Sequence, residues 1–253
     1  ISVLFCTQRY LHVASSPTGI LFNPESIANT LNKLTLFTNA DAANRLIEAE
    51  LRNTDGRWYN YNFHSVFCDS DKSHATDKMV SAHMAGVNAL QSADIVIITF
   101  GTAWAYYLKE CGEVVANCHK QPQSLFSRQL LSVEHIAKRY DKLLSDGALA
   151  QKRVIFTVSP IRHLADGAED NSRSKATLRV AIAKLVRNHS NVEYFPSFEI
   201  VNDELRDYRF YADDMVHPSP LAIDYIWQRF SEYAFNTTTR QLIEQIARIT
   251  QAA

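Results

Sequence analysis

A run of β-branched and aliphatic residues, flanked by amphipathic helices, most constrains what this chain can fold into. Residues 93–100 read Ala-Asp-Ile-Val-Ile-Ile-Thr-Phe, and such a run is typical of a strand buried on both faces of a parallel sheet. Apolar residues at helical spacing precede it and recur after it, in a strand–helix order. The predicted elements are helix 76–90, strand 93–100, helix 132–144, strand 154–158, helix 174–187 and strand 192–195. Units of this length indicate right-handed crossovers, and hence an α/β fold with a parallel sheet covered by helices on both faces.

Capping signals place further helices at the two ends of this pattern. Asn23-Pro24-Glu25 predicts a helix to about residue 31, and Ser219-Pro220 predicts one to about residue 233, because a capping side chain followed by proline suits the free N–H groups of a first turn. The remaining predictions are helices at 40–51 and 240–250, a strand around residues 12–15, and a long ordered loop over 57–74. With 253 residues and no convincing linker, we expect one domain over residues 1–253.

Composition excludes several classes of function. The formal charge is −1, which argues against a nucleic-acid or acidic-membrane partner, and no apolar run approaches the roughly 20 residues needed to span a bilayer. The four cysteines lack paired spacing, which favours reduced thiols and a cytoplasmic protein, although a removed leader stays open because the sequence begins at Ile1. His64 with Cys68, or Cys111 with Cys118 and His119, could be imagined as zinc ligands, but none has the spacing of a structural zinc site. We therefore predict neither a metal nor a cofactor.

The sharpest chemical signal is Asp213-Asp214-Met215-Val216-His217, just before the helix that Ser219 caps. A carboxylate three residues before a histidine can orient the imidazole and stabilise the imidazolium that forms when the histidine takes a proton from a nucleophile. The alternative is a turn-capping aspartate beside a loop histidine. In parallel α/β folds the site lies at the carboxyl ends of the strands, so the loops after residues 16, 100, 158 and 195 are expected to face it.

Several stretches, in order along the chain, resemble the GSCFA family of the SGNH/GDSL hydrolase superfamily. They are Pro-Thr-Gly-Ile-Leu-Phe-Asn-Pro at 17–24, Phe-Gly-Thr-Ala-Trp at 100–104, Val-Ala-Asn-Cys-His-Lys at 115–120, Val-Ser-Pro-Ile-Arg-His at 158–163, and Arg-Asp-Tyr-Arg-Phe-Tyr-Ala-Asp-Asp-Met-Val-His-Pro-Ser at 206–219. The resemblance implies a three-layer, flavodoxin-like SGNH fold. It also implies a serine esterase or acyltransferase without a cofactor, acting on a small-molecule or carbohydrate ester.

The resemblance also implies roles for individual residues. Asp214 and His217 match the acid and base of the Ser-His-Asp triad in type, spacing and position. Gly19 stands where the superfamily has its oxyanion-hole glycine. The usual asparagine of the third-strand block is missing from Gly101-Thr102-Ala103, so Asn117 is the expected substitute donor. Three residues that follow strand ends are expected to bind substrate: His119, Arg162 and His163.

The start of the chain departs from the family pattern. The Gly-Ser-Cys-Phe-Ala motif that names the family should follow the first strand, but residues 3–8 read Val-Leu-Phe-Cys-Thr-Gln. A parallel crossover needs ten or more residues, so we expect the first βα unit, and the nucleophilic serine with it, to be incomplete in this sequence. Two alternatives stay open. The protein is a non-catalytic ligand-binding protein on an SGNH scaffold, or Cys6 is itself the nucleophile.

Overall fold

A parallel sheet organises the middle of the chain in this computed structural model, which describes residues 13–251. Its described strands are β3 (Ile95–Phe100), β7 (Arg153–Val158) and β8 (Val192–Tyr194), in the order β3-β7-β8. β3 pairs with β7 in parallel along its whole length, and β7 pairs with β8 in parallel from Val154 opposite Val192. An α/β fold with a parallel sheet is therefore confirmed.

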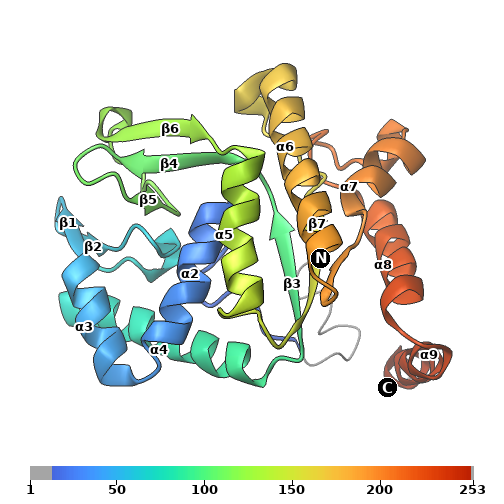
Figure 1. Cartoon of the computed structure of the whole chain (residues 1–253), viewed down its shortest axis with the longest axis horizontal. Helices are drawn as coiled ribbons and strands as arrows, with labels where there is room; N and C mark the ends of the chain where they lie inside the picture. The colour runs from blue at the N-terminus through green and yellow to red at the C-terminus, as the bar shows by residue number, and fades with distance from the viewer. Residues whose placement is uncertain (1–12, 252–253) are drawn as a thin grey trace. The chain divides into compact units, whose positions relative to one another are not determined.

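Three helices lie side by side against this sheet: α2 (Pro24–Leu36), α5 (Val133–Ser145) and α6 (Gly167–Asn188) (Figure 1). Tyr140 of α5 is fully buried, with its ring 5.1 Å from that of Phe100 on β3 and 5.5 Å from that of Phe156 on β7. Its hydroxyl donates to the carbonyl of Pro24, which ties α5 to the start of α2. Burying an aromatic side chain of this size stabilises a fold by about 2–3 kcal/mol, so this cluster is a main anchor of the sheet.

The prediction that the run 93–100 is buried on both faces is wrong for one face. Ile95 and Ile97 are 47% and 44% exposed, whereas Ile98 and Phe100 are buried. Because side chains alternate between the two faces of a strand, one face of β3 is covered and the face that carries Ile95 and Ile97 is largely open. The predicted interior pattern is seen on β7, which is buried from Val154 to Val158.

The predicted helices are all present, with shifted bounds. Asn23, Ser132 and Ser219 each cap a helix by accepting a hydrogen bond from a backbone N–H in its first turn. The other helices are α3 (Ala40–Glu50), α4 (Lys72–Ser92), α8 (Pro220–Ala234) and α9 (Thr237–Gln251). α6 begins at Gly167, seven residues before the predicted start at Ser174. Its first two turns are polar, so the apolar periodicity could not reveal them, but Glu169 and Asp170 suit the positive end of a helix.

Two small antiparallel sheets were not predicted. β1 (Arg52–Thr54) and β2 (Arg57–Tyr59) form a hairpin around Asp55-Gly56, which both have positive φ, where a long loop was expected to begin. The second sheet has the order β5-β4-β6 and comprises β4 (Trp104–Leu108), β5 (Val114–Val115) and β6 (Phe126–Leu130). The strand expected around residues 12–15 is absent over 13–15, and residue 12 lies outside the described residues.

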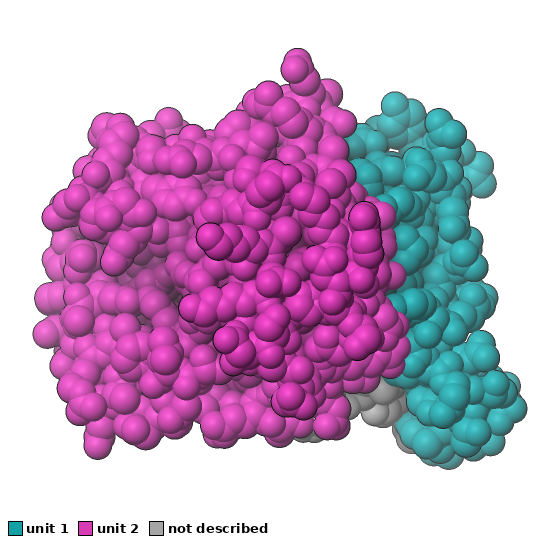
Figure 2. Space-filling model, viewed as in Figure 1, with its two compact units in different colours: residues 1–15, 159–162, 195–253 teal, residues 16–158, 163–194 magenta. Residues whose placement is uncertain are grey.

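Contacts divide the described chain into two compact units (Figure 2). Unit 2 comprises residues 16–158 and 163–194 and contains all the sheets. Unit 1 comprises residues 13–15, 159–162 and 195–251, with α8, α9, the short α7 (Ser197–Glu199) and the single turns η4 (Ile200–Glu204) and η5 (Tyr208–Phe210). Phe195, Trp227 and Phe230 are buried in unit 1, and their rings pack together. The single domain expected from the sequence stays a prediction.

Candidate functional site

The loop between η5 and α8 in unit 1 holds Asp214 and His217 in direct contact. The Nδ1 atom of His217 lies 2.5 Å from Oδ2 of Asp214. The other carboxylate oxygen, Oδ1, accepts hydrogen bonds from the backbone N–H groups of Val216 and His217, both at 2.9 Å. The Asp214 carboxylate is thus fixed by backbone groups of the turn that it begins. Because His217 follows three residues later, its imidazole reaches the other carboxylate oxygen, Oδ2. The sequence prediction that these two side chains meet is confirmed by this geometry.

The ends of this loop are tied together by backbone hydrogen bonds. The N–H of Ala212 donates to the carbonyl of His217 at 2.8 Å, and the N–H of Ser219 donates to that of Phe210 at 2.9 Å. Ser219 also donates from its hydroxyl to the carbonyl of Arg209, while accepting from an N–H in the first turn of α8. Met215 turns the chain with a positive φ of 60°. Asp214 and His217 therefore sit on a closed loop anchored to a capped helix.

The electrostatics of the pair favour a charged carboxylate. The backbone N–H of His217, then its imidazole, and the N–H of Val216 lower the pKa of Asp214 to about 2. With Asp214 ionised, Nδ1 of His217 is the protonated nitrogen and Nε2 is left as a proton acceptor. Among the described residues Nε2 has no hydrogen-bond partner, and the side chain is 59% exposed. The arrangement can therefore take a proton from an incoming hydroxyl.

Three other histidine–carboxylate pairs occur in the described residues, and each differs from this one. His135 and His189 contact their carboxylates through Nε2, which leaves Nδ1, the less accessible nitrogen, for any further role. His74 uses Nδ1, but its partner Asp69 is shared with Lys78 at 3.2 Å. The Asp69 carboxylate also accepts a backbone N–H, at 3.2 Å, so its contact with Lys78 is what sets it apart. Asp214–His217 combines Nδ1 contact, an exposed side chain and a carboxylate that two backbone N–H groups hold and no lysine contacts. That combination is what general-base catalysis by histidine requires.

The neighbouring residues Arg162 and His163 belong to different units. Arg162 is in unit 1, where its guanidinium lies 5.1 Å from the centre of the Tyr211 ring and donates to the Tyr211 hydroxyl at 3.0 Å. His163 is in unit 2, where its ring packs edge-on against Phe22 and burial lowers its pKa. The structure thus places Arg162, but not His163, in the same unit as the dyad, the pair formed by Asp214 and His217.

Gly19 lies in a turn of unit 2, with a positive φ of 95° that favours glycine. Its N–H donates to the carbonyl of Ser16 at 3.3 Å, a long bond that a stronger acceptor could replace. A side chain at this position would collide with Cβ of His64. Close packing thus explains the glycine without a catalytic role, and its role in an oxyanion hole stays a prediction.

Asn117 and His119 lie on a strained turn of unit 2. Oδ1 of Asn117 accepts from the N–H of His119 at 2.8 Å, and both His119 and Lys120 have positive φ. The ring of His119 packs against the rings of two tyrosines, with Nε2 2.9 Å from the carbonyl of Asn60 and Nδ1 3.4 Å from Sγ of Cys68. Burial lowers the pKa of His119, so the ring is neutral. Both ring nitrogens have partners within the unit, which is the geometry of a structural histidine, and Nδ2 of Asn117 is the group left to act as a donor.

Sequence reasoning missed two polar side chains of α6 that hold the turn after β3. Nζ of Lys175 donates to the carbonyl of Gly101 at 2.5 Å, and Oγ of Ser174 accepts from the N–H of Ala103 at 2.7 Å. Both residues are 1% exposed, and burial lowers the pKa of Lys175 to about 8. The sequence could have revealed Lys175 by its position. It stands three residues before Leu178, and residues three apart share one face of a helix, here the buried face. The two side chains fix the loop that follows the carboxyl end of β3.

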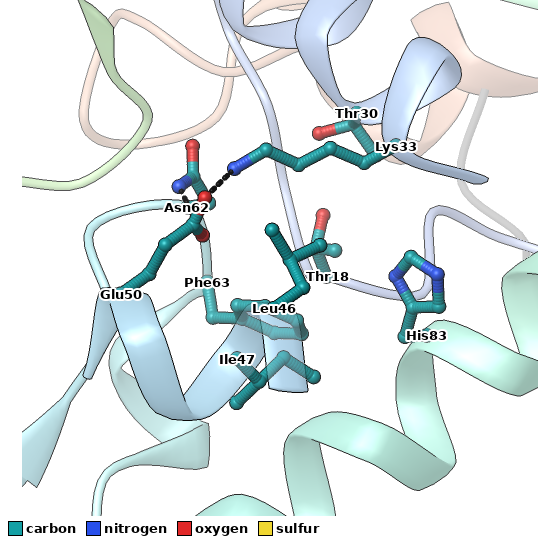
Figure 3. A pocket seen from close by; sticks show the side chains of 9 residues that line it. All are labelled: Thr18, Thr30, Lys33, Leu46, Ile47, Glu50, Asn62, Phe63 and His83. Carbon is teal, nitrogen blue, oxygen red and sulfur yellow. Dashed lines mark hydrogen bonds and ion pairs between the residues drawn. The ribbon is translucent and has the colours of Figure 1, made fainter. Parts of the chain in front are cut away.

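The remaining kinds of site in question for the described part of the chain are a small cavity, a metal site, a disulfide and a membrane span. A cavity between α2, α3 and α4 has a volume of only about 10 Å³, with Thr18 and His83 on its wall, which is too small for a ligand (Figure 3). Among residues 13–251, no three His, Cys, Asp or Glu side chains gather as metal ligands would. The three described cysteines are free thiols. None of the described helices combines the length and apolar character needed to cross a membrane.

Comparison with known proteins identifies the family. Neither a curated protein nor a solved structure shows significant similarity to the chain. The model of the GSCFA family, in contrast, matches residues 5–230, which include both members of the dyad and every predicted site residue. Because this match spans far more than half of the sequence, the chain belongs to the GSCFA family.

Proposed function

We propose that this chain is an acyl-ester hydrolase or acyltransferase with a three-layer, flavodoxin-like SGNH fold. The observation that carries the proposal is the contact of 2.5 Å between Nδ1 of His217 and a carboxylate whose other oxygen is held by two backbone N–H groups. Such a pair orients the imidazole before any substrate arrives, so its Nε2 is ready to act as a base.

In the proposed reaction, Nε2 of His217 takes the proton of a serine hydroxyl as its oxygen attacks the ester carbonyl carbon. Asp214 stabilises the imidazolium that forms. The imidazolium then returns the proton to the departing alcohol, leaving an acyl-enzyme that water or an acceptor alcohol resolves. The place where the family's serine is expected, and Cys6 beside it, lie outside the described residues.

The substrate side of the proposal rests on the family resemblance. The N–H of Gly19 and the amide of Asn117 are the proposed oxyanion donors, and removing one such donor typically costs on the order of a hundredfold in rate. His119, Arg162 and His163 are proposed to contact the substrate. Of these, Arg162 is best placed for recognition, because its exposed guanidinium is oriented by Tyr211 on the same unit. The proposed substrate is an O-acylated carbohydrate or another small ester.

The test is turnover of p-nitrophenyl acetate by the full-length protein, with its complete first βα unit, and by its His217→Ala variant. We expect the variant to lose at least about a thousandfold in kcat, as triad histidines do. His74→Ala is the matched control, because His74 also contacts an aspartate through Nδ1 on an exposed surface, and its turnover should be unchanged. If the wild type does not exceed His217→Ala, generic esterase activity is refuted, and a selective acyltransferase or a non-catalytic ligand-binding protein takes its place.

A further inference from the structure

A polar groove in unit 2 has the size of a small-molecule site. Its volume is about 400 Å³, within the range of known ligand pockets, and none of the dyad's residues line it. It runs between α2 and the turn that joins β4 to β5, and Figure 2 shows unit 2 hollowed in this region. The side chains that matter are Glu25, Asn29, Glu50, Asn62 and Tyr107.

One wall of the groove is a carboxylate fixed by three donors. Oε1 of Glu50 lies 2.5 Å from Nζ of Lys33, while Oε2 accepts from the amides of Asn60 and Asn62 at 3.3 and 3.0 Å (Figure 3). The charge of Glu50 is therefore balanced by Lys33. The carbonyl oxygen of the Asn62 side chain has no partner among the described residues, which leaves a free acceptor on this wall.

A second carboxylate is fixed in the same way by α5. Glu25 lies 2.7 Å from Nε2 of His135 and 3.1 Å from Nε of Arg139. Nη2 of Arg139 also donates to Oδ1 of Asn29 at 2.6 Å. That bond turns the amide of Asn29 so that its carbonyl faces Arg139, and its NH₂ group has no partner in the described part of the chain. Asn29 thus adds a free donor to the groove.

A third uncharged group is the Tyr107 hydroxyl, which can both donate and accept. Burial and the charge of Glu25 raise the pKa of Tyr107, so the hydroxyl keeps its proton. No partner for it lies among the described residues. The groove therefore offers a free donor, a free acceptor and a group that is both. Beside them stand two carboxylates whose charges are already balanced, and the exposed carboxylate of Glu113 at the rim.

This set of groups selects one chemical class of ligand. An apolar ligand would bury these polar atoms without partners, at about 1–3 kcal/mol for each. An anion would meet three carboxylates. A cation would compete with Lys33 and Arg139 for the two inner carboxylates, and only the exposed Glu113, whose charge water screens, would be left to it. Hydroxyl groups, which donate and accept at once, fit all three free groups. We propose that this groove binds a neutral saccharide, through Asn29, Asn62 and Tyr107.

The proposal does not depend on the proposed hydrolysis. We would titrate the full chain with maltose, cellobiose and N,N′-diacetylchitobiose, and follow binding by saturation-transfer-difference NMR. We expect saturable transfer to at least one of these sugars, weakened by about threefold to tenfold in Tyr107→Phe, which loses one hydrogen bond. Tyr106→Phe is the matched control, since Tyr106 is the next residue on β4 and points to the opposite face.

Three results would overturn the proposal. They are the absence of saturable transfer from every sugar, equal effects of Tyr106→Phe and Tyr107→Phe, and binding of spermidine with no binding of sugar, which would assign the groove to a cation. Binding that survives in His217→Ala while turnover is lost would separate the groove from the dyad. The same variant thus distinguishes failure of this proposal from failure of the proposed hydrolase.

Discussion

The buried lysine on α6 allows a prediction with a definite sign and size. Lys175 is 1% exposed, and burial lowers its pKa from 10.5 to about 8. Replacing it by methionine keeps the length of the side chain and removes the ionisable group. The hydrogen bond to the carbonyl of Gly101 is lost at every pH, at a cost of about 1 kcal/mol. What distinguishes the two proteins is how their stability depends on pH.

The magnitude follows from proton linkage. Below pH 8 the lysine is charged in both states, and the folded state bears the full cost of burying that charge. At 1.36 kcal/mol per pKa unit, the fall from 10.5 to about 8 corresponds to about 3.4 kcal/mol. Between the two values the unfolded chain binds more protons than the folded one, so stability rises with pH. From about pH 7 to about pH 9.5, this one group should raise the free energy of unfolding by about 2 kcal/mol.

The assay is urea denaturation at both pH values for wild type, Lys175→Met and Lys138→Met. Other groups titrate in this range, but they do so in all three proteins, so the comparison isolates Lys175. Lys138 is exposed on α5 and should follow the wild type. Lys175→Met should lack the gain of about 2 kcal/mol. If its stability changes with pH just as that of the wild type does, the buried lysine is not charged at neutral pH and the reasoning fails.

Three further substitutions test the dyad, the cap that anchors its loop, and a turn of unit 2. In Asp214→Asn, the charge that stabilises an imidazolium is lost, so kcat for p-nitrophenyl acetate should fall by about 10⁴, and a fall of less than about tenfold would contradict the assigned role. Ser219→Ala and Ser132→Ala each remove a helix cap and should each lower the free energy of unfolding by about 1 kcal/mol in urea. Turnover should drop only for Ser219→Ala, which also loosens the dyad loop, and equal turnover would refute that link. In a thermal melt, Lys120→Gly should raise the free energy of unfolding by about 1 kcal/mol, because glycine adopts the positive φ at this position without strain. Lys142→Gly, inside a helix, should lower it by about as much. Changes of the same sign would exclude backbone strain at Lys120 as the cause.

Local chemistry explains which parts of the fold could be predicted. Helix caps at Asn23, Ser132 and Ser219 are decided by side chains next to the backbone groups they satisfy, so the sequence displays them directly. The contact between Asp214 and His217 was predictable for the same reason, because only three residues separate them. The β1–β2 hairpin is equally local, because Asp55-Gly56 is a typical two-residue hairpin turn, although a loop was predicted from residue 57 on.

Long-range packing explains the rest. Nothing near Lys175 in the sequence reveals that the carbonyl of Gly101, 74 positions away, receives its ammonium group. The exposure of Ile95 and Ile97 depends on which elements cover that face of β3, not on the composition of β3 itself. The groove was missed because its walls come from segments more than 100 residues apart, as in the ion pair of Glu25 with His135. Such sites become visible only when the chain is folded.

The short span of the dyad loop has a consequence for how the site could be controlled. Bringing together residues so close in sequence costs little chain entropy, and the loop is closed by its own backbone bonds. Any movement of this segment would therefore carry the proposed acid and base together. Control by separating Asp214 from His217 would require local unfolding. Moving the intact pair toward or away from a substrate requires only displacement of the loop. The short span of the loop favours this mode of control.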